Sequence, residues 1–221
     1  MAAVLGLVVP AGVSAKMSAA GNVVAISHDS SVTTEELQNL AKQGNDKSHR
    51  IAIILGRTDD EKIRVIVRED VEVTYASHYR RTIVTGVAHL KNAQVPLAHE
   101  LTHILTGRAA THVLSEGFAV YMQERTGTGR VFPNYGRDVD ARLRENAIKW
   151  NIPVPPDAYG FAVDHIGDME QMRKRIMSYL FAGSFCRFVI ETVLGGDVPK
   201  FMKIFYSGDF EAVTGKTREE L

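Results

Sequence analysis

The periodicity of the sequence changes near Asn92, and this change constrains the fold more than any other feature. Before Asn92, runs of β-branched residues, several of them alternating with polar residues, predict strands, whereas helical periodicity dominates after it. A capping box formed by Thr33 and Glu36 predicts one early helix that ends near Gly44. The order of a small sheet followed by helices predicts an α+β fold rather than alternating strands and helices.

We expect strands at 22–27, 50–55, 62–68, 71–76 and 81–90. The first helix after Asn92 is expected to begin near Pro96 and to end at Gly107, because proline suits a first helical turn and glycine a helix end. Further helices are expected at 114–125, 138–150, 169–194, 198–206 and 209–214. A single domain is predicted over 21–221, with a sheet part at about 21–92 and a helical part at about 93–221.

Charge and cysteine content limit the partners and the kinds of metal site. The 221 residues carry a formal net charge of zero and a single cysteine, Cys186. Nucleic-acid-binding proteins usually show a basic surplus, so no nucleic-acid partner is expected. One cysteine supplies neither an intrachain disulfide framework nor a CxxC metal site. A metal ion in this chain must therefore be bound by histidine and carboxylate side chains.

Two histidines, His99 and His103, lie four residues apart in the helix expected to end at Gly107. Side chains at this spacing share one helix face, so both imidazoles can reach the same ion. Glu100 lies close enough to act on a water molecule at that ion, which is the chemical reason for the HExxH pattern. The alternative is a surface helix that carries two histidines without a metal.

Catalytic zinc sites use three protein ligands and keep one position for water. Glu116 stands early in the next expected helix, after a spacer of twelve residues from His103. A short loop after Gly107 lets the second helix return beside the first and bring this carboxylate to the two imidazoles. The alternative is an acidic residue favoured by the dipole at a helix N-terminus. We predict one Zn²⁺ per chain, bound by His99, His103 and Glu116.

The segments LAHELTHIL at 97–105 and LSEGFAVYM at 114–122 resemble the gluzincin zinc metallopeptidases, in which a downstream glutamate follows HExxH. The short spacer is similar to that of small peptidase-MA-like domains, which are distantly similar to the catalytic core of aminopeptidase N. The resemblance covers roughly 50–221. It implies a zincin-like fold, with a small twisted sheet packed on the HExxH helix. It also implies hydrolysis of peptide bonds by a metal-activated water with Glu100 as general base.

A later segment, YLFAGSF at 179–185, is similar to a helix whose tyrosine stabilises the oxyanion in that family. This implies a catalytic role for Tyr179, although it stands four residues before Gly183 where aminopeptidase-N-type enzymes have three. His165 is the rival oxyanion donor. The strand expected at 81–90 is the best candidate edge for binding an extended peptide. The acidic residue with which those enzymes bind a free N-terminus is absent from 85–88, so exopeptidase activity does not carry over from the resemblance, and both endopeptidase and exopeptidase activity stay open.

The first twenty residues allow two interpretations. An apolar run at 2–9 and a small-residue cleavage pattern at 13–15 indicate a signal peptide and export, but no Lys or Arg precedes the run. The other interpretation is a disordered N-terminus on a cytoplasmic protein. The run is too short for a transmembrane helix, so membrane association is expected only if this segment is retained.

The sequence thus predicts an enzyme that acts on a peptide or protein substrate. A competing prediction is a non-catalytic peptidase-like domain that keeps the zinc site and serves in binding or regulation. The intact set of His99, Glu100, His103 and Glu116 favours the enzyme.

Overall fold

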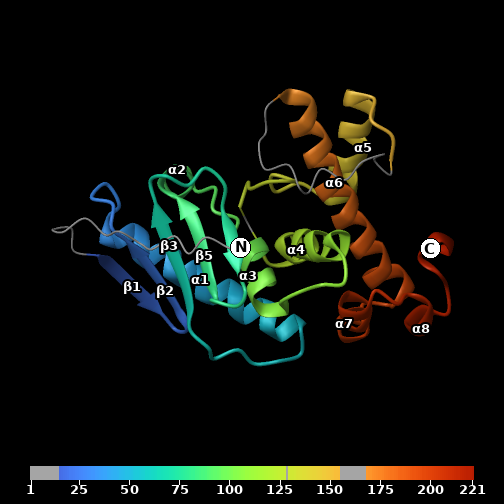
Figure 1. Ribbon diagram of the computed structural model, residues 1–221, viewed down its shortest axis with the longest axis horizontal. Coiled ribbons are helices and arrows are strands. Elements are labelled where there is room, and N and C mark those ends of the chain that lie inside the picture. The colour runs from blue at the N-terminus through green and yellow to red at the C-terminus, as the bar shows by residue number, and fades with distance from the viewer. Residues whose placement is uncertain (1–14, 128, 155–167) are drawn as a thin grey trace, which may run out of the picture.

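The computed structural model of the protein describes residues 15–127, 129–154 and 168–221. Within these residues, the strands form one sheet in the order β1-β2-β3-β5-β4. Its strands are β1 (Lys16–Ala20), β2 (Val23–Ser27), β3 (Ile63–Arg68), β4 (Tyr75–Ser77) and β5 (Thr82–Gly86). The inner strands β2, β3 and β5 are parallel, whereas β1 and β4 pair antiparallel at the two edges. The sheet is therefore mixed, and β4 forms the edge nearest the helical part (Figure 1).

Alternating burial in β3 shows which face of the sheet carries the core. Ile63, Val65 and Val67 are buried, whereas Arg64 and Arg68 are exposed. Helix α1 (Thr34–Ile54) connects β2 to the parallel strand β3, a connection that requires a crossover. It contributes Leu37, Leu40 and Ile51 to the same core cluster as the inward side chains of β3. The apolar side of the sheet is thus closed by a helix that precedes the change in periodicity.

Helix α1 confirms the predicted capping box and corrects two other predictions. Thr33 and Glu36 make both reciprocal hydrogen bonds at its start. The helix does not end near Gly44 but continues to Ile54, so the strand predicted at 50–55 is wrong. Gly44 lies where α1 approaches β2, because an added Cβ would come within 2.9 Å of Val23 Cγ1. The glycine therefore serves close packing inside the helix rather than its termination.

The strands expected at 71–76 and 81–90 are also shorter than predicted. The first is confined to β4, and the second ends at Gly86, where the short helix α2 (Val87–Lys91) begins. Strand β5 has β4 on one side and β3 on the other, so the predicted edge position of 81–90 is wrong. The strand β1 falls within the range considered as a signal peptide, and residues 1–14 lie outside the described part of the chain.

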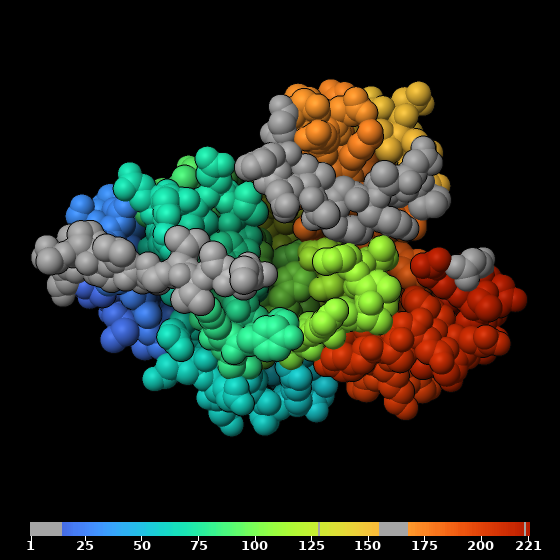
Figure 2. Space-filling view, viewed as in Figure 1, coloured from blue at the N-terminus to red at the C-terminus, as the bar shows by residue number. Residues whose placement is uncertain are grey.

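After α2 the described chain is helical, and the predicted α+β class is confirmed. Its helices are α3 (Leu97–Thr106), α4 (His112–Thr126), α5 (Val139–Trp150), α6 (Met169–Arg187), α7 (Val198–Ser207) and α8 (Glu211–Thr214). A π-helical segment, η2 (Phe188–Val193), extends α6, and a 3-10 turn, η3 (Arg218–Glu220), follows α8. Figure 2 shows the blue-to-teal sheet part and the green-to-red helical part side by side, with a hollow where they meet.

Helices α4 and α6 cross closely because glycines lie at their contact. A Cβ on Gly117 would come within 2.3 Å of the Ala182 carbonyl oxygen, and one on Gly183 within 2.5 Å of Val120 Cγ1.

The combined helix Met169–Val193 is long and apolar enough to cross a membrane by length and composition alone. Half of its apolar window is buried inside the fold.

Candidate metal centre

The first element of the candidate site is α3, a helix buried on nearly all sides. All of its residues except His103 are buried, and Gly107 ends it with a φ of 71°, in the left-handed region that favours glycine. His99 and Glu100 are each only 6% exposed although both are polar. Buried polar side chains need hydrogen-bond or ligand partners. The side chains of His99 and Glu100 must therefore find partners other than bulk water.

The second element is α4, which returns beside α3 after a short loop. Thr111 caps α4, since its hydroxyl accepts a hydrogen bond of 3.2 Å from the Leu114 backbone N–H. This cap fixes where the helix begins and places Glu116 in its early turns. Gly117, the next residue, lets α6 approach α4 closely on the same part of the helix. The predicted hairpin of α3 and α4 is therefore present, and the first turns of α4 face the histidines of α3.

Three side-chain atoms from this hairpin form a nearly equilateral triangle. His99 Nε2 lies 3.1 Å from Glu116 Oε2 and 3.2 Å from His103 Nε2. The third side, from His103 Nε2 to Glu116 Oε2, measures 3.4 Å. Among the described residues, these three form the group whose ligand atoms could hold a metal ion. We refer to His99, His103 and Glu116 as the triad.

The dimensions of the triad fit a tetrahedral zinc ion. Zinc binds imidazole nitrogen and carboxylate oxygen at about 2.0–2.1 Å, so tetrahedral geometry separates its ligand atoms by about 3.3–3.4 Å. The three sides of the triangle, 3.1, 3.2 and 3.4 Å, lie close to this value. Two nitrogens and one oxygen also match the ligand chemistry of zinc. The residues present therefore suit a three-ligand site with one position left for water or substrate.

The charges of the triad favour an ionised carboxylate. Burial alone would raise the pKa of Glu116, but hydrogen bonds with His103 and His99 outweigh it and lower that pKa. Burial would lower the pKa of His103, and its hydrogen bond to Glu116 raises it above the ordinary value instead. Glu116 thus stays negative beside two imidazoles, as a cation ligand must.

Glu100 and Tyr179 complete the polar surroundings of the triad. Burial raises the pKa of Glu100, although the neighbouring His99 and His103 oppose the shift. Burial also raises the pKa of Tyr179, with the charge of Glu116 as a second cause, so its hydroxyl keeps its proton. The rings of Tyr179 and His99 lie 6.0 Å apart between centroids. The tyrosine of α6 is therefore close to the triad, although α6 begins more than fifty residues after Glu116.

The two histidines differ in the contacts of the second ring nitrogen, Nδ1. His103 Nδ1 lies 3.4 Å from the Ser115 hydroxyl, a long contact from the residue before Glu116. His99 Nδ1 is buried and has no hydrogen-bond partner among the described residues. The orientation of the His99 ring therefore depends on the contacts of Nε2 with Glu116 and His103 and on packing, which includes the T-shaped contact with His103 at 4.9 Å.

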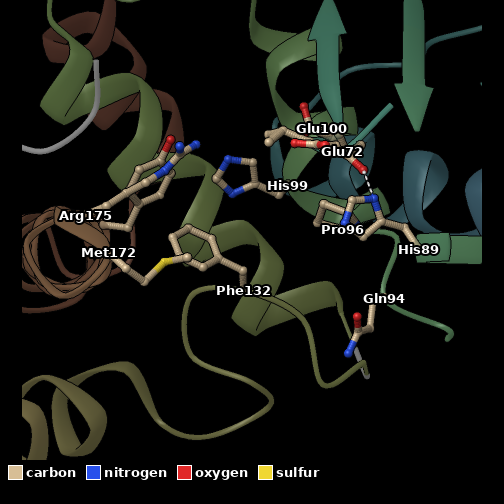
Figure 3. A pocket seen from close by; sticks show the side chains of 12 residues that line it. Glu72, His89, Gln94, Pro96, His99, Glu100, Phe132, Met172 and Arg175 are labelled. Atoms are coloured by element: carbon tan, nitrogen blue, oxygen red, sulfur yellow. Dashed lines mark hydrogen bonds between the residues drawn. The ribbon is translucent and has the colours of Figure 1, made fainter. Parts of the chain in front are cut away.

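Two neighbouring cavities that share lining residues open on this site. The smaller, of about 190 Å³, is lined by residues of α3, α6 and the loop before β4, among them His99, Glu100, Arg175 and Tyr179. The same four residues line a broader cleft that also reaches His103 and Glu116. Figure 3 shows His99 in the smaller pocket between Arg175 on one side and Glu72 and His89 on the other. A ligand could therefore approach the triad from the side of β4 and α6.

The structure brings together most of the residues singled out from the sequence, and it adds others. His99, Glu100, His103, Glu116 and Tyr179 all lie around one cleft. His165, the rival oxyanion donor, lies outside the described residues.

Sequence reasoning missed Glu72, Phe132 and Arg175, which also line the pocket. A helical spacing of four residues joins Arg175 to Tyr179 and could have identified the arginine, whereas no sequence signal points to the other two.

Comparisons with known proteins support the fold. The native structure of leukotriene A4 hydrolase from Saccharomyces cerevisiae is similar with a TM-score of 0.53 and 14% identity, over 90% of this chain and 35% of that chain. The yeast LTA4 hydrolase in complex with Bestatin is similar with a TM-score of 0.51 and 17% identity, over 86% of this chain and 33% of that chain. This chain spans about a third of the length of these proteins. No family model and no curated protein matches the sequence.

Proposed function

We propose that this chain is a zinc-dependent peptidase. The observation that carries the proposal is the triad, whose sides of 3.1, 3.2 and 3.4 Å suit a tetrahedral zinc ion. Glu100 lies on the same helix as the two histidines and lines the same cleft. The fold, shared with part of a hydrolase at low identity, is compatible with this chemistry but does not define the reaction.

The chain supplies a base and a hydrogen-bond donor for hydrolysis. When bound, zinc would supply a Lewis acid that polarises a carbonyl group and activates water. Glu100 would take a proton from the attacking water and give it to the leaving amine. Burial raises the pKa of Glu100, and a cation on the triad would oppose this rise, because positive charge favours the carboxylate. Tyr179, protonated because burial raises its pKa, would donate a hydrogen bond to the oxyanion.

The edge of the sheet offers a place for an extended substrate. Residues 73–76, which lead into and begin β4, line the same cleft as the triad residues. Within the described chain, β4 pairs with β5 on one side and has no strand on the other. A peptide could add to that free edge through main-chain hydrogen bonds and so present its carbonyl groups to the triad. We therefore propose β4, rather than the strand predicted at 81–90, as the edge that binds an extended peptide.

The test compares wild-type protein with Glu100→Gln, both loaded with zinc, on a mixed peptide library. Glu100→Gln should retain one zinc per chain, because Glu100 is not a ligand, and should lose about 10²–10⁴-fold in turnover. Glu124→Gln is the matched control. Glu124 is a partly buried glutamate of α4 that accepts a hydrogen bond from the Val139 backbone N–H, and an amide oxygen can still accept it.

The outcomes separate the enzyme from the zinc-retaining binding domain. Loss of turnover in Glu100→Gln, with zinc content and Glu124→Gln activity unchanged, supports the peptidase. Equal turnover in wild type and Glu100→Gln contradicts it. A wild-type chain that binds one zinc and cleaves no peptide in the library also contradicts it and favours a binding or regulatory domain.

A further inference from the structure

Arg175 lies where the two cavities of the site meet. It lines the smaller pocket together with His99 and Glu100, and it also lines the broad cleft that reaches His103 and Glu116. Helix α6 carries it one turn before Tyr179, on the wall that faces the triad. No role in hydrolysis has yet been given to this side chain, although it is placed beside the proposed reacting groups.

Aromatic rings hold the guanidinium of Arg175 at the pocket wall. Its central carbon lies 5.9 Å from the ring centroid of Phe132 and 5.7 Å from that of Tyr179. Contacts of this kind use the flat face of a guanidinium and the face of a ring. The guanidinium also makes a side-chain hydrogen bond with Tyr179. A guanidinium carries five N–H groups, so one such bond does not use its whole capacity to donate. Because the side chain is already packed against two rings, it loses less conformational entropy when a ligand binds.

The pocket has an uneven distribution of charge. Among its described lining residues, Arg175 carries the single permanent positive charge, whereas Glu72 and Glu100 are acidic. Figure 3 shows Arg175 on the opposite side of His99 from Glu72. A negatively charged group would be attracted to the α6 side and repelled from the Glu72 side. The pocket volume of about 190 Å³ is smaller than the 300–1,000 Å³ typical of whole-ligand sites, so it suits one group of a substrate.

We propose that Arg175 binds a carboxylate of the substrate and so gives the site a preference for peptides with an acidic group near the cleaved bond. The planar fork of a guanidinium matches the two oxygens of a carboxylate in a way that an ammonium group does not. The carboxylate can belong to an aspartate or glutamate side chain or to the C-terminus of a short peptide. This inference rests on the proposed peptidase function and names its substrate class.

The experiment uses three N-acetylated, fluorescence-quenched hexapeptides of otherwise identical sequence. The first has glutamine at the variable position and a C-terminal amide, the second has glutamate instead of glutamine, and the third has glutamine with a free C-terminal carboxylate. The variable position is moved through the sequence in parallel sets. Values of kcat and KM are measured on zinc-loaded wild type, Arg175→Gln and Arg175→Lys.

A matched control is available two residues away on the same helix. Arg173 packs over Trp150 at 5.9 Å and does not line either cavity, so Arg173→Gln removes an arginine–aromatic contact without touching the site. Wild type and Arg173→Gln should cleave at least one carboxylate peptide about 10- to 100-fold more efficiently than the neutral one. In Arg175→Gln this ratio should fall to about one, and in Arg175→Lys to an intermediate value.

The ratio between peptides distinguishes substrate binding from a structural role. If Arg175 only held Tyr179 in place, Arg175→Gln would slow all three peptides equally, and the proposal would be overturned. Equal rates for neutral and carboxylate peptides in wild type would also overturn it. Preference for the second peptide identifies an acidic side chain as the bound group, and preference for the third identifies the C-terminus.

A binding measurement separates this inference from the proposed function. The same peptides are titrated against the zinc-loaded Glu100→Gln protein and the Glu100→Gln/Arg175→Gln double variant. Tighter binding of a carboxylate peptide that disappears with Arg175 supports the inference even if the wild type cleaves nothing. Equal binding of neutral and carboxylate peptides to Glu100→Gln contradicts it even if the wild type is an active peptidase.

Discussion

The two walls of the cleft are built in different ways. The triad wall comes from α3 and α4, consecutive helices that carry His99, His103 and Glu116 within eighteen residues of sequence. The facing wall comes from β4 and α6, which are separated by more than ninety residues. Local sequence therefore determines the triad wall, whereas the facing wall exists only once the whole fold has formed. Changes in the first should remove the metal, and changes in the second should alter rate and selectivity with the metal still bound.

The largest effect is expected from Glu116→Gln in the triad wall. A neutral amide replaces a carboxylate whose pKa is lowered by hydrogen bonds with His103 and His99, so it loses the charge that favours a cation. Zinc affinity should fall by more than about 100-fold, and turnover should be lost with it. Competition with a chromophoric chelator measures the affinity. Glu124→Gln on the same helix should bind zinc like the wild type, and unchanged affinity in Glu116→Gln would contradict the triad.

The second-largest effect is expected from Tyr179→Phe in the facing wall. This change removes one hydroxyl beside the triad and keeps the ring that packs against Phe132 at 5.0 Å. We expect kcat to fall by about 10²–10³-fold, because the proposed oxyanion donor is lost, with zinc affinity unchanged. Tyr206→Phe is the control, since it removes a hydroxyl that donates to the Thr106 carbonyl outside the cavities. Full activity in Tyr179→Phe would assign the oxyanion to another group.

A third change disturbs the contact between the two walls. An alanine at Gly117 would place its Cβ within 2.3 Å of the Ala182 carbonyl and 2.6 Å of Cys186 Sγ, so α4 and α6 must move apart. Overpacking of this kind costs about 1–3 kcal/mol, which should lower Tm by several degrees. Differential scanning calorimetry measures the loss. Gly129→Ala, whose Cβ would make only an ordinary contact at 3.5 Å, should leave Tm unchanged.

The smallest effect is expected from Ser115→Ala. The serine hydroxyl lies 3.4 Å from His103 Nδ1, near the limit of a hydrogen bond, so it can contribute little to the orientation of the ring. Zinc affinity should fall by about tenfold or less, at the low end of losses seen for residues behind a ligand. Ser207→Ala, which removes a hydroxyl that donates to the Lys203 carbonyl and accepts from the Asp209 backbone N–H, is the control in the same chelator assay. A loss as large as that of Glu116→Gln would show that the contact is much stronger than its length indicates.

The difference between the walls also explains what the sequence could predict. The capping box at Thr33, the helix end at Gly107 and the hairpin to Glu116 depend on neighbouring residues, and all three are present in the structure. The β-branched residues of the apolar run at 50–55 predict a strand, although such residues can also occupy a helix. Packing of α1 against β2 at Gly44 decides for the helix, and this contact cannot be seen in local sequence.

The facing wall was predicted only in part for the same reason. Tyr179 was identified through a family resemblance, and its catalytic role stays a prediction. The edge strand was assigned to 81–90, whereas the sheet order places β4 at the edge beside the site. Arg175 and Phe132 meet across more than forty residues of sequence, so no local pattern joins them. Long-range contacts of this kind arise from the packing of α6 and follow from the structure alone.

Zinc-edge anomalous diffraction from crystals of the zinc-loaded protein tests the central claim most directly. We expect one anomalous peak per chain at about 2.0–2.2 Å from His99 Nε2, His103 Nε2 and a Glu116 carboxylate oxygen, with the fourth position facing the cleft. Crystals of Glu116→Gln grown with the same zinc concentration should show a weaker peak or none. A protein that binds no zinc at the triad, or holds its zinc elsewhere, would contradict the account.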